Sequence, residues 1–123
     1  MQGKISGTDW IYKSGLAEPV SSDNSLNVNI YDIDPDGGDP CGIFPFTGAN
    51  NVLLMSFPES TGLYTLGSSR TITLYDSYTN YILTEGKFEI LTIDSIGMVT
   101  GRIAAGYNSN NYINGNFSVT YCP

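Results

Sequence analysis

A run of aspartates in the first third of the chain has the spacing of a cation-binding loop. Asp32, Asp34 and Asp36 precede a glycine in a D-x-D-x-D-G pattern, in which three carboxylates surround Ca²⁺ while the glycine permits a sharp turn. Position twelve of such a loop is normally a bidentate glutamate, but this chain has Ile43 there. Two interpretations remain open: an irregular calcium loop that uses Asp39 or backbone carbonyls as extra ligands, and a solvated acidic turn without metal. We expect no other cofactor.

Tyrosines interleaved with amide side chains form a second candidate site, in segments 75–81 and 107–112. Tyrosine rings stack on sugar rings, and asparagine side chains hydrogen-bond hydroxyl groups. These hairpin tips are therefore candidates for binding a glycan, although tyrosine and asparagine are also frequent at ordinary strand ends and turns. The candidate ligand-binding residues are Tyr78, Tyr81, Asn108, Asn111 and Tyr112.

Enzymatic chemistry has little support in this sequence. The chain has no histidine, which excludes Ser-His and Cys-His nucleophile pairs. Glu85 and Glu89 are a candidate carboxylate pair, since a glycosidase needs two carboxyl groups roughly 5 to 9.5 Å apart. We therefore expect a protein that is not an enzyme, with a carboxylate-dependent hydrolase as an alternative.

The two cysteines, Cys41 and Cys122, have no third cysteine or histidine with them, so a four-ligand zinc site cannot form. We predict that they form a disulfide; two unrelated buried thiols are the alternative. In the chain-entropy model, closing a loop of about 80 residues would stabilise the fold by about 4 kcal/mol. Such a bond is typical of proteins outside the reducing cytosol.

The chain is acidic, with twelve Asp and Glu against five Lys and Arg. A negative surface repels phosphate backbones, so nucleic acid is not an expected partner. No apolar run approaches the roughly 18 residues that would span a bilayer, and residues 1–4 do not resemble a signal peptide. We interpret Met1 as a start added to a mature extracytoplasmic domain whose leader was removed; a cytosolic protein is the alternative.

The remaining patterns predict one all-β domain over residues 1–123. Apolar and polar residues alternate over 26–31, which indicates a half-buried strand. A strand is also expected over 52–57, where the continuous apolar run 52–55 indicates burial on both faces. Helical periodicity is nearly absent. We predict an antiparallel β-sandwich or flattened barrel of about eight to nine strands, with 32–48 as a long irregular loop. Further strands are expected at 71–75, 81–84, 87–94, 98–105 and 112–122.

Several short motifs carry a family resemblance: Gly3-Lys4-Ile5-Ser6-Gly7-Thr8-Asp9-Trp10, Gly15-Leu16-Ala17, Gly86-Lys87-Phe88-Glu89-Ile90, Val99-Thr100-Gly101 and Ile113-Asn114-Gly115-Asn116-Phe117. Together they resemble uncharacterised Bacteroidetes-type surface lipoproteins. The resemblance implies an exported β domain, tethered through a lipidated cysteine upstream, with no established activity. It therefore bears on localisation more than on function.

A second comparison is with the calycins, whose first strand carries Gly-x-Trp. Here two residues separate Gly7 from Trp10, so a calycin-like closed barrel holding an apolar ligand is an alternative, and we expect Trp10 to be a core anchor.

Our preferred hypothesis is a monomeric, noncatalytic, extracytoplasmic module, with a binding or structural role. Its partner would be a glycan or a protein at the cell surface, contacted through the acidic loop and the tyrosine-rich hairpins.

Overall fold

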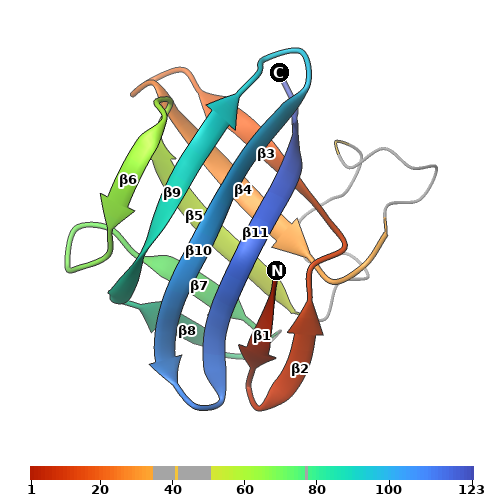
Figure 1. The fold of residues 1–123 in the computed structure, drawn as a ribbon, viewed down its shortest axis with the longest axis vertical. Coiled ribbons are helices and arrows are strands. Elements are labelled where there is room, and N and C mark those ends of the chain that lie inside the picture. The colour runs from red at the N-terminus through yellow and green to blue at the C-terminus, as the bar shows by residue number, and fades with distance from the viewer. Residues whose placement is uncertain (35–40, 42–50, 77) are drawn as a thin grey trace.

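A computed structural model describes residues 1–34, 41, 51–76 and 78–123. These residues contain eleven strands and no α-helix, which confirms the all-β prediction (Figure 1). The strands are β1 (Gln2–Ile5), β2 (Thr8–Ile11), β3 (Ser14–Val20), β4 (Ser25–Tyr31), β5 (Val52–Pro58), β6 (Gly62–Thr65), β7 (Ile72–Tyr75), β8 (Asn80–Leu83), β9 (Glu85–Ile93), β10 (Met98–Asn108) and β11 (Asn111–Tyr121).

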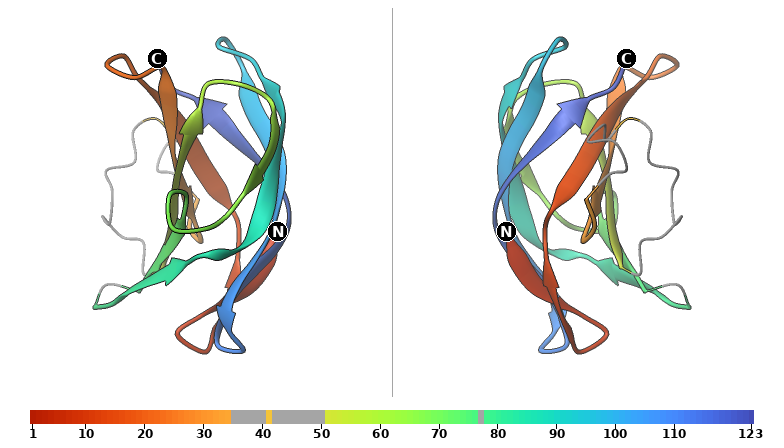
Figure 2. Two further views of the ribbon diagram at one scale, coloured as in Figure 1. Left: turned by 90° about the vertical axis from the view of Figure 1, so that its left-hand side faces the viewer. Right: turned by 90° about the vertical axis from the view of Figure 1, so that its right-hand side faces the viewer.

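Nine of the strands follow one another in a single sheet, in the order β6-β9-β10-β11-β3-β4-β5-β7-β8. All neighbours on this path are antiparallel except β11 and β3, which pair in parallel through Thr120 and Leu16. The sheet folds over into a front layer of β6, β9, β10 and β11 and a back layer of β3, β4, β5, β7 and β8 (Figures 1 and 2). The path ends at β6 and β8 and they do not pair within the described residues, so the fold is the predicted flattened barrel, left open on one side.

The β1–β2 hairpin extends the front layer beside the lower half of β11. β1 pairs with β11 from Gln2 opposite Asn114 to Lys4 opposite Tyr112. At the turn of this hairpin, the Gly7 amide donates to the Asn110 carbonyl at 2.9 Å. The hairpin is therefore attached to β11 and to the turn that follows β10.

The core lies between the two layers and is filled by large apolar side chains. The Phe88 ring lies 5.8 Å from the Phe57 ring and stacks on Tyr64 at 5.2 Å, measured between centroids. Trp10 is 1% exposed, and its indole Nε1 donates to the Asn51 carbonyl at 3.2 Å, which confirms it as a core anchor. Each such side chain contributes roughly 1.5–3 kcal/mol on burial.

The predicted disulfide between Cys41 and Cys122 is present, with the two Cα atoms 5.6 Å apart. Cys122 follows β11, and its amide donates to the Ala17 carbonyl at 2.8 Å. Its sulfur lies in a small apolar cluster on the outer side of the back layer, with Leu16, Tyr31 and Val52. The bond therefore fixes the end of the chain to the segment that follows β4. The rest of the expected irregular loop, 35–40 and 42–48, lies outside the described residues.

No helix in the described part of the chain has the length and apolar character needed to cross a membrane.

Candidate functional site

The outward side chains of the front layer form a shallow trough centred on β10, which we call the β10 trough. Successive strand residues point to opposite faces, and Ile103 and Ala105 are buried while Ala104 is exposed. Ala104 and Gly106 therefore lie on the outer face, where both have little or no side chain. Because the neighbouring strands carry longer side chains at these positions, β10 becomes the floor of a depression.

Cross-strand pairing decides which residues line the walls of the trough. Ala104 lies between Lys87 on β9 and Asn114 on β11, and Gly106 lies between Glu85 and Tyr112. Two inter-strand spacings separate the walls, roughly 10 Å between their backbones. The trough thus places a cation, a carboxylate, an amide and a phenol around an apolar floor.

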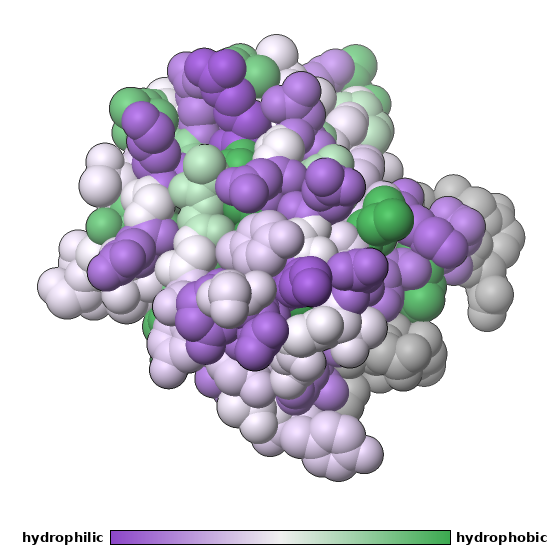
Figure 3. All heavy atoms as spheres, turned by 60° about the horizontal axis from the view of Figure 1, so that its bottom comes forward, coloured by the Kyte–Doolittle hydropathy of each residue, from purple (hydrophilic) through white to green (hydrophobic). Residues whose placement is uncertain are grey.

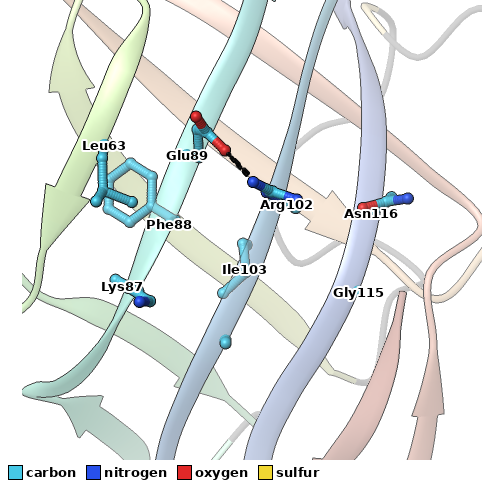
Figure 4. A pocket seen from close by; sticks show the side chains of 9 residues that line it. Leu63, Lys87, Phe88, Glu89, Arg102, Ile103, Gly115 and Asn116 are labelled. Atoms are coloured by element: carbon cyan, nitrogen blue, oxygen red, sulfur yellow. Dashed lines mark hydrogen bonds and ion pairs between the residues drawn. The ribbon is translucent and has the colours of Figure 1, made fainter.

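The upper end of the trough is a hollow of about 370 Å³ that Figure 4 shows from close by. Arg102 closes this end on β10, where its Nε and Nη2 donate to Glu89 Oε1 at 2.8 and 2.6 Å. Leu63 contributes an apolar side chain from β6, and Asn116 an amide from β11. These two bonds to one carboxylate oxygen keep the Arg102 side chain over the sheet.

The lower end is a hollow of about 480 Å³ that shares Ala104 with the upper one. Tyr107 and Asn108 line it, together with the wall residues Glu85, Tyr112 and Asn114. Figure 3 views the molecule from this end, where the surface is mostly hydrophilic or neutral with separate hydrophobic patches. Both hollows have volumes within the roughly 300–1,000 Å³ that is typical of small-ligand sites.

The structure separates the five predicted ligand-binding residues into different environments. Asn108 and Tyr112 line the trough. Tyr78 is 94% exposed in the turn between β7 and β8, in the back layer. Tyr81 is half-buried, and its ring lies 6.0 Å from that of Tyr107. Only part of the predicted cluster therefore faces one surface.

Asn111 differs from the expectation, since it is 2% exposed and its side chain is used within the fold. Its Oδ1 accepts the Ser6 amide at 2.7 Å, and its Nδ2 donates to Asn108 Oδ1 at 3.2 Å. A buried amide with both ends bonded holds two turns together. The structure thus gives Asn111 a structural role at the lower end of the barrel, not that of an exposed ligand contact.

A second polar group at this end connects the β1–β2 turn to the β7–β8 turn. The Ser6 hydroxyl donates to Asp76 Oδ2 at 2.6 Å and lies 2.8 Å from the Tyr81 hydroxyl. Asp76 Oδ1 also accepts the amides of Tyr78 and Thr79 at 3.0 and 2.7 Å. These bonds, the one from Ser6 first, lower the pKa of the Asp76 carboxyl. Asp76 is therefore an ionised acceptor that stabilises the turns.

The two glutamates of the candidate hydrolase pair lie on the same face of one strand. Glu85 and Glu89 are four residues apart on the outer face of β9, which separates their Cα atoms by roughly 13 Å at the rise of a strand. Glu89 is also bound by Arg102.

The predicted calcium ligands are described only in part. Asp36 and Asp39 lie outside the described residues, and Asp34 is exposed. Burial raises the pKa of the Asp32 carboxyl, a shift that favours its neutral form. Within the described residues, no group of three or more Asp, Glu, Cys or His side chains is placed to hold a metal ion. Calcium binding therefore stays a prediction.

Lys87, Arg102, Ala104 and Gly106 were not predicted as site residues. The available signal was the pair of small residues two positions apart, because Ala104 and Gly106 share one face of a strand whose other face is apolar. No protein-family model, curated protein or solved structure matches the chain.

Proposed function

We propose that the protein is a noncatalytic extracytoplasmic module that binds a glycan in the β10 trough. The observation that carries this proposal is the register across β9, β10 and β11, which surrounds a small-residue floor with hydrogen-bonding side chains on both walls. A sugar ring has apolar C–H faces and hydroxyl groups around its edge. Ala104 and Gly106 leave room for the ring, while the walls reach its edge.

The wall residues offer the donors and acceptors that hydroxyl groups require. Lys87 donates, Glu85 accepts, and Asn114 and Tyr112 do both. The Tyr112 side chain is partly exposed, so its ring is available for contact with a sugar face. Few ligands other than carbohydrates combine so many hydroxyls with apolar faces.

The extracytoplasmic location is supported by the disulfide between Cys41 and Cys122, since structural disulfides are rare in the cytosol. The resemblance to Bacteroidetes-type surface lipoproteins agrees with it. The absence of histidine and the ion pair that holds Glu89 to Arg102 favour binding without catalysis.

The proposal is tested by screening the protein on a glycan array and measuring hits by calorimetry, with an Ala104→Leu variant beside the wild type. The leucine fills the floor of the trough and removes no hydrogen-bonding group, so we expect binding to fall at least about tenfold. Ser56→Leu is the matched control, because Ser56 is exposed on the outer face of the back layer. Unchanged binding by Ala104→Leu, or no glycan bound by the folded wild type, would overturn the proposal.

A further inference from the structure

We infer that the glycan bound in the β10 trough is acidic, with its carboxylate or sulfate group at Lys87; this rests on the proposed function. The chain carries a net charge of −7 and has only five cationic side chains. Three of the five, Lys4, Lys87 and Arg102, are on the outer face of β1, β9 and β10. The other two are Lys13, which follows β2, and Arg70, which lies over the Tyr64 ring. Of these three, Lys87 and Arg102 line the trough, whereas Lys4 lies outside it, 4.0 Å from Asp9 Oδ1.

Lys87 has neutral neighbours on the adjacent strands. It lies between Ala104 on β10 and Thr65 on β6, and within the described residues it forms no ion pair. An ammonium group without an anionic partner on a concave surface is suited to bind an anion from solution. Neither flanking side chain is long enough to cover it.

The nearest carboxylate above Lys87 is already neutralised. Glu89 accepts two donors from Arg102, which leaves the other N–H groups of that guanidinium for a ligand. The Arg102 side chain is 64% exposed, so these donors are accessible from the trough. An anionic group beside Lys87 would therefore lie between two cationic side chains.

The charges of the trough also suggest a direction for the ligand. Lys87 and Arg102 make the upper end cationic, whereas Glu85, Asn108 and Tyr107 make the lower end rich in acceptors and hydroxyls. A uronic acid or a sulfated sugar could place its anion at the upper end and its hydroxyls toward Glu85. A neutral sugar would leave Lys87 without an ionic partner.

Calorimetry with matched polymers tests this inference. Polygalacturonate is compared with its methyl ester, and dextran sulfate with dextran. We expect tight binding of at least one acidic polymer, weaker binding of its neutral partner, and affinity that falls with added salt. Binding of polygalacturonate alone would identify a carboxylate ligand, and binding of dextran sulfate alone a sulfate ligand; either result supports the inference.

Substitution separates recognition at Lys87 from general attraction of a polyanion. Lys87→Gln should lower the affinity for the acidic polymer about tenfold, since a charge-assisted hydrogen bond is lost. Lys13→Gln removes the same charge outside the trough and should leave the affinity within about twofold. Equal losses in both variants would overturn the inference. Equal binding of neutral and acidic members would overturn it while leaving the proposed function intact, and binding of no glycan on the array would overturn both.

Discussion

Removal of the disulfide between Cys41 and Cys122 is expected to lower the free energy of unfolding by about 4.5 kcal/mol. The two cysteines are 81 positions apart, so the bond closes most of the chain into one loop. For a loop of this length, the chain-entropy model gives about 15 cal/mol/K of entropy withheld from the unfolded state, or about 4.5 kcal/mol at 25 °C. With about 2.1 cal/mol/K of unfolding entropy per residue, the melting temperature should fall by about 17 °C.

The loss should come from the cross-link and not from the packing of the sulfur atoms. Cys122 is buried against Leu16, Tyr31 and Val52, whereas Cys41 is exposed. Cys41→Ala therefore cuts the bond while leaving the buried thiol in place. Reduction of the wild type cuts the same bond and keeps both sulfur atoms. The two treatments should agree to within about 1 kcal/mol if loop closure is the cause.

Urea unfolding followed by the fluorescence of Trp10 is a suitable assay, because this single tryptophan is buried in the core. The dependence on urea should also become steeper without the bond, since an unfolded chain that is not cross-linked exposes more surface. A loss below about 1 kcal/mol in both Cys41→Ala and the reduced wild type would refute the loop-closure reasoning.

Two further predictions concern the packing and the pH dependence of the fold. Gly101→Ala should destabilise the protein by about 1–3 kcal/mol, because the added Cβ would lie 2.4 Å from the Glu89 carbonyl oxygen and 2.8 Å from Phe117 Cζ. The control, Gly67→Ala, meets no atom within 4 Å and should leave the midpoint of urea unfolding nearly unchanged. Equal urea midpoints for the two variants would contradict the packing argument. The pKa of the Asp76 carboxyl is lowered chiefly by its hydrogen bond from Ser6. The ionised carboxylate therefore stabilises the folded state at pH values above the pKa of about 3.9 that an aspartate has in the unfolded chain. This stabilisation is lost as the pH falls through the lower pKa of the folded state. Asp76→Asn should therefore reduce stability at neutral pH and flatten its decline below about pH 4 in urea titrations; an unchanged acid dependence would show that these bonds do not act on folding.

The longer strands could be predicted because their sequences carry enough of the two-residue period. Residues 26–31 alternate clearly, and β4 is Ser25–Tyr31. The predicted strands at 98–105 and 112–122 correspond to β10 and β11. In each case most inward residues are apolar and most outward ones polar, as burial of one face requires.

The missed strands depend on partners that are far away in sequence. β1, β2 and β6 have only four residues each, too few to show a period. β3 contains Gly15 and Pro19, which weaken a strand pattern, yet it pairs along its whole length with β4. An Asn-Gly pair such as Asn114-Gly115 favours a tight hairpin turn, but none forms here, because β10 pairs with β11 on both sides of Gly115. Whether such a segment forms a strand depends on the strands it pairs with, and the local sequence does not show which strands these are.

The trough could not be predicted for a related reason, since cross-strand register decides which side chains meet. The register between β9 and β10 shifts by one residue beside Gly101: Thr100 is opposite Thr92, while Gly101 is opposite Ile90. Such a bulge leaves one residue, Leu91, without a partner.

Without that bulge, continued pairing from Thr100 and Thr92 would place Ala104 opposite Phe88. Phe88 belongs to the core and Ala104 to the outer face, and residues directly opposite each other share a face of the sheet. The bulge resolves this conflict, because it sets Phe88 opposite Ile103 inside the barrel and Lys87 opposite Ala104 outside it. One unpaired residue therefore both completes the core and brings a cation to the wall of the trough. A surface assembled in this way depends on a backbone bulge, and the types of the residues that the bulge brings together do not indicate where it occurs.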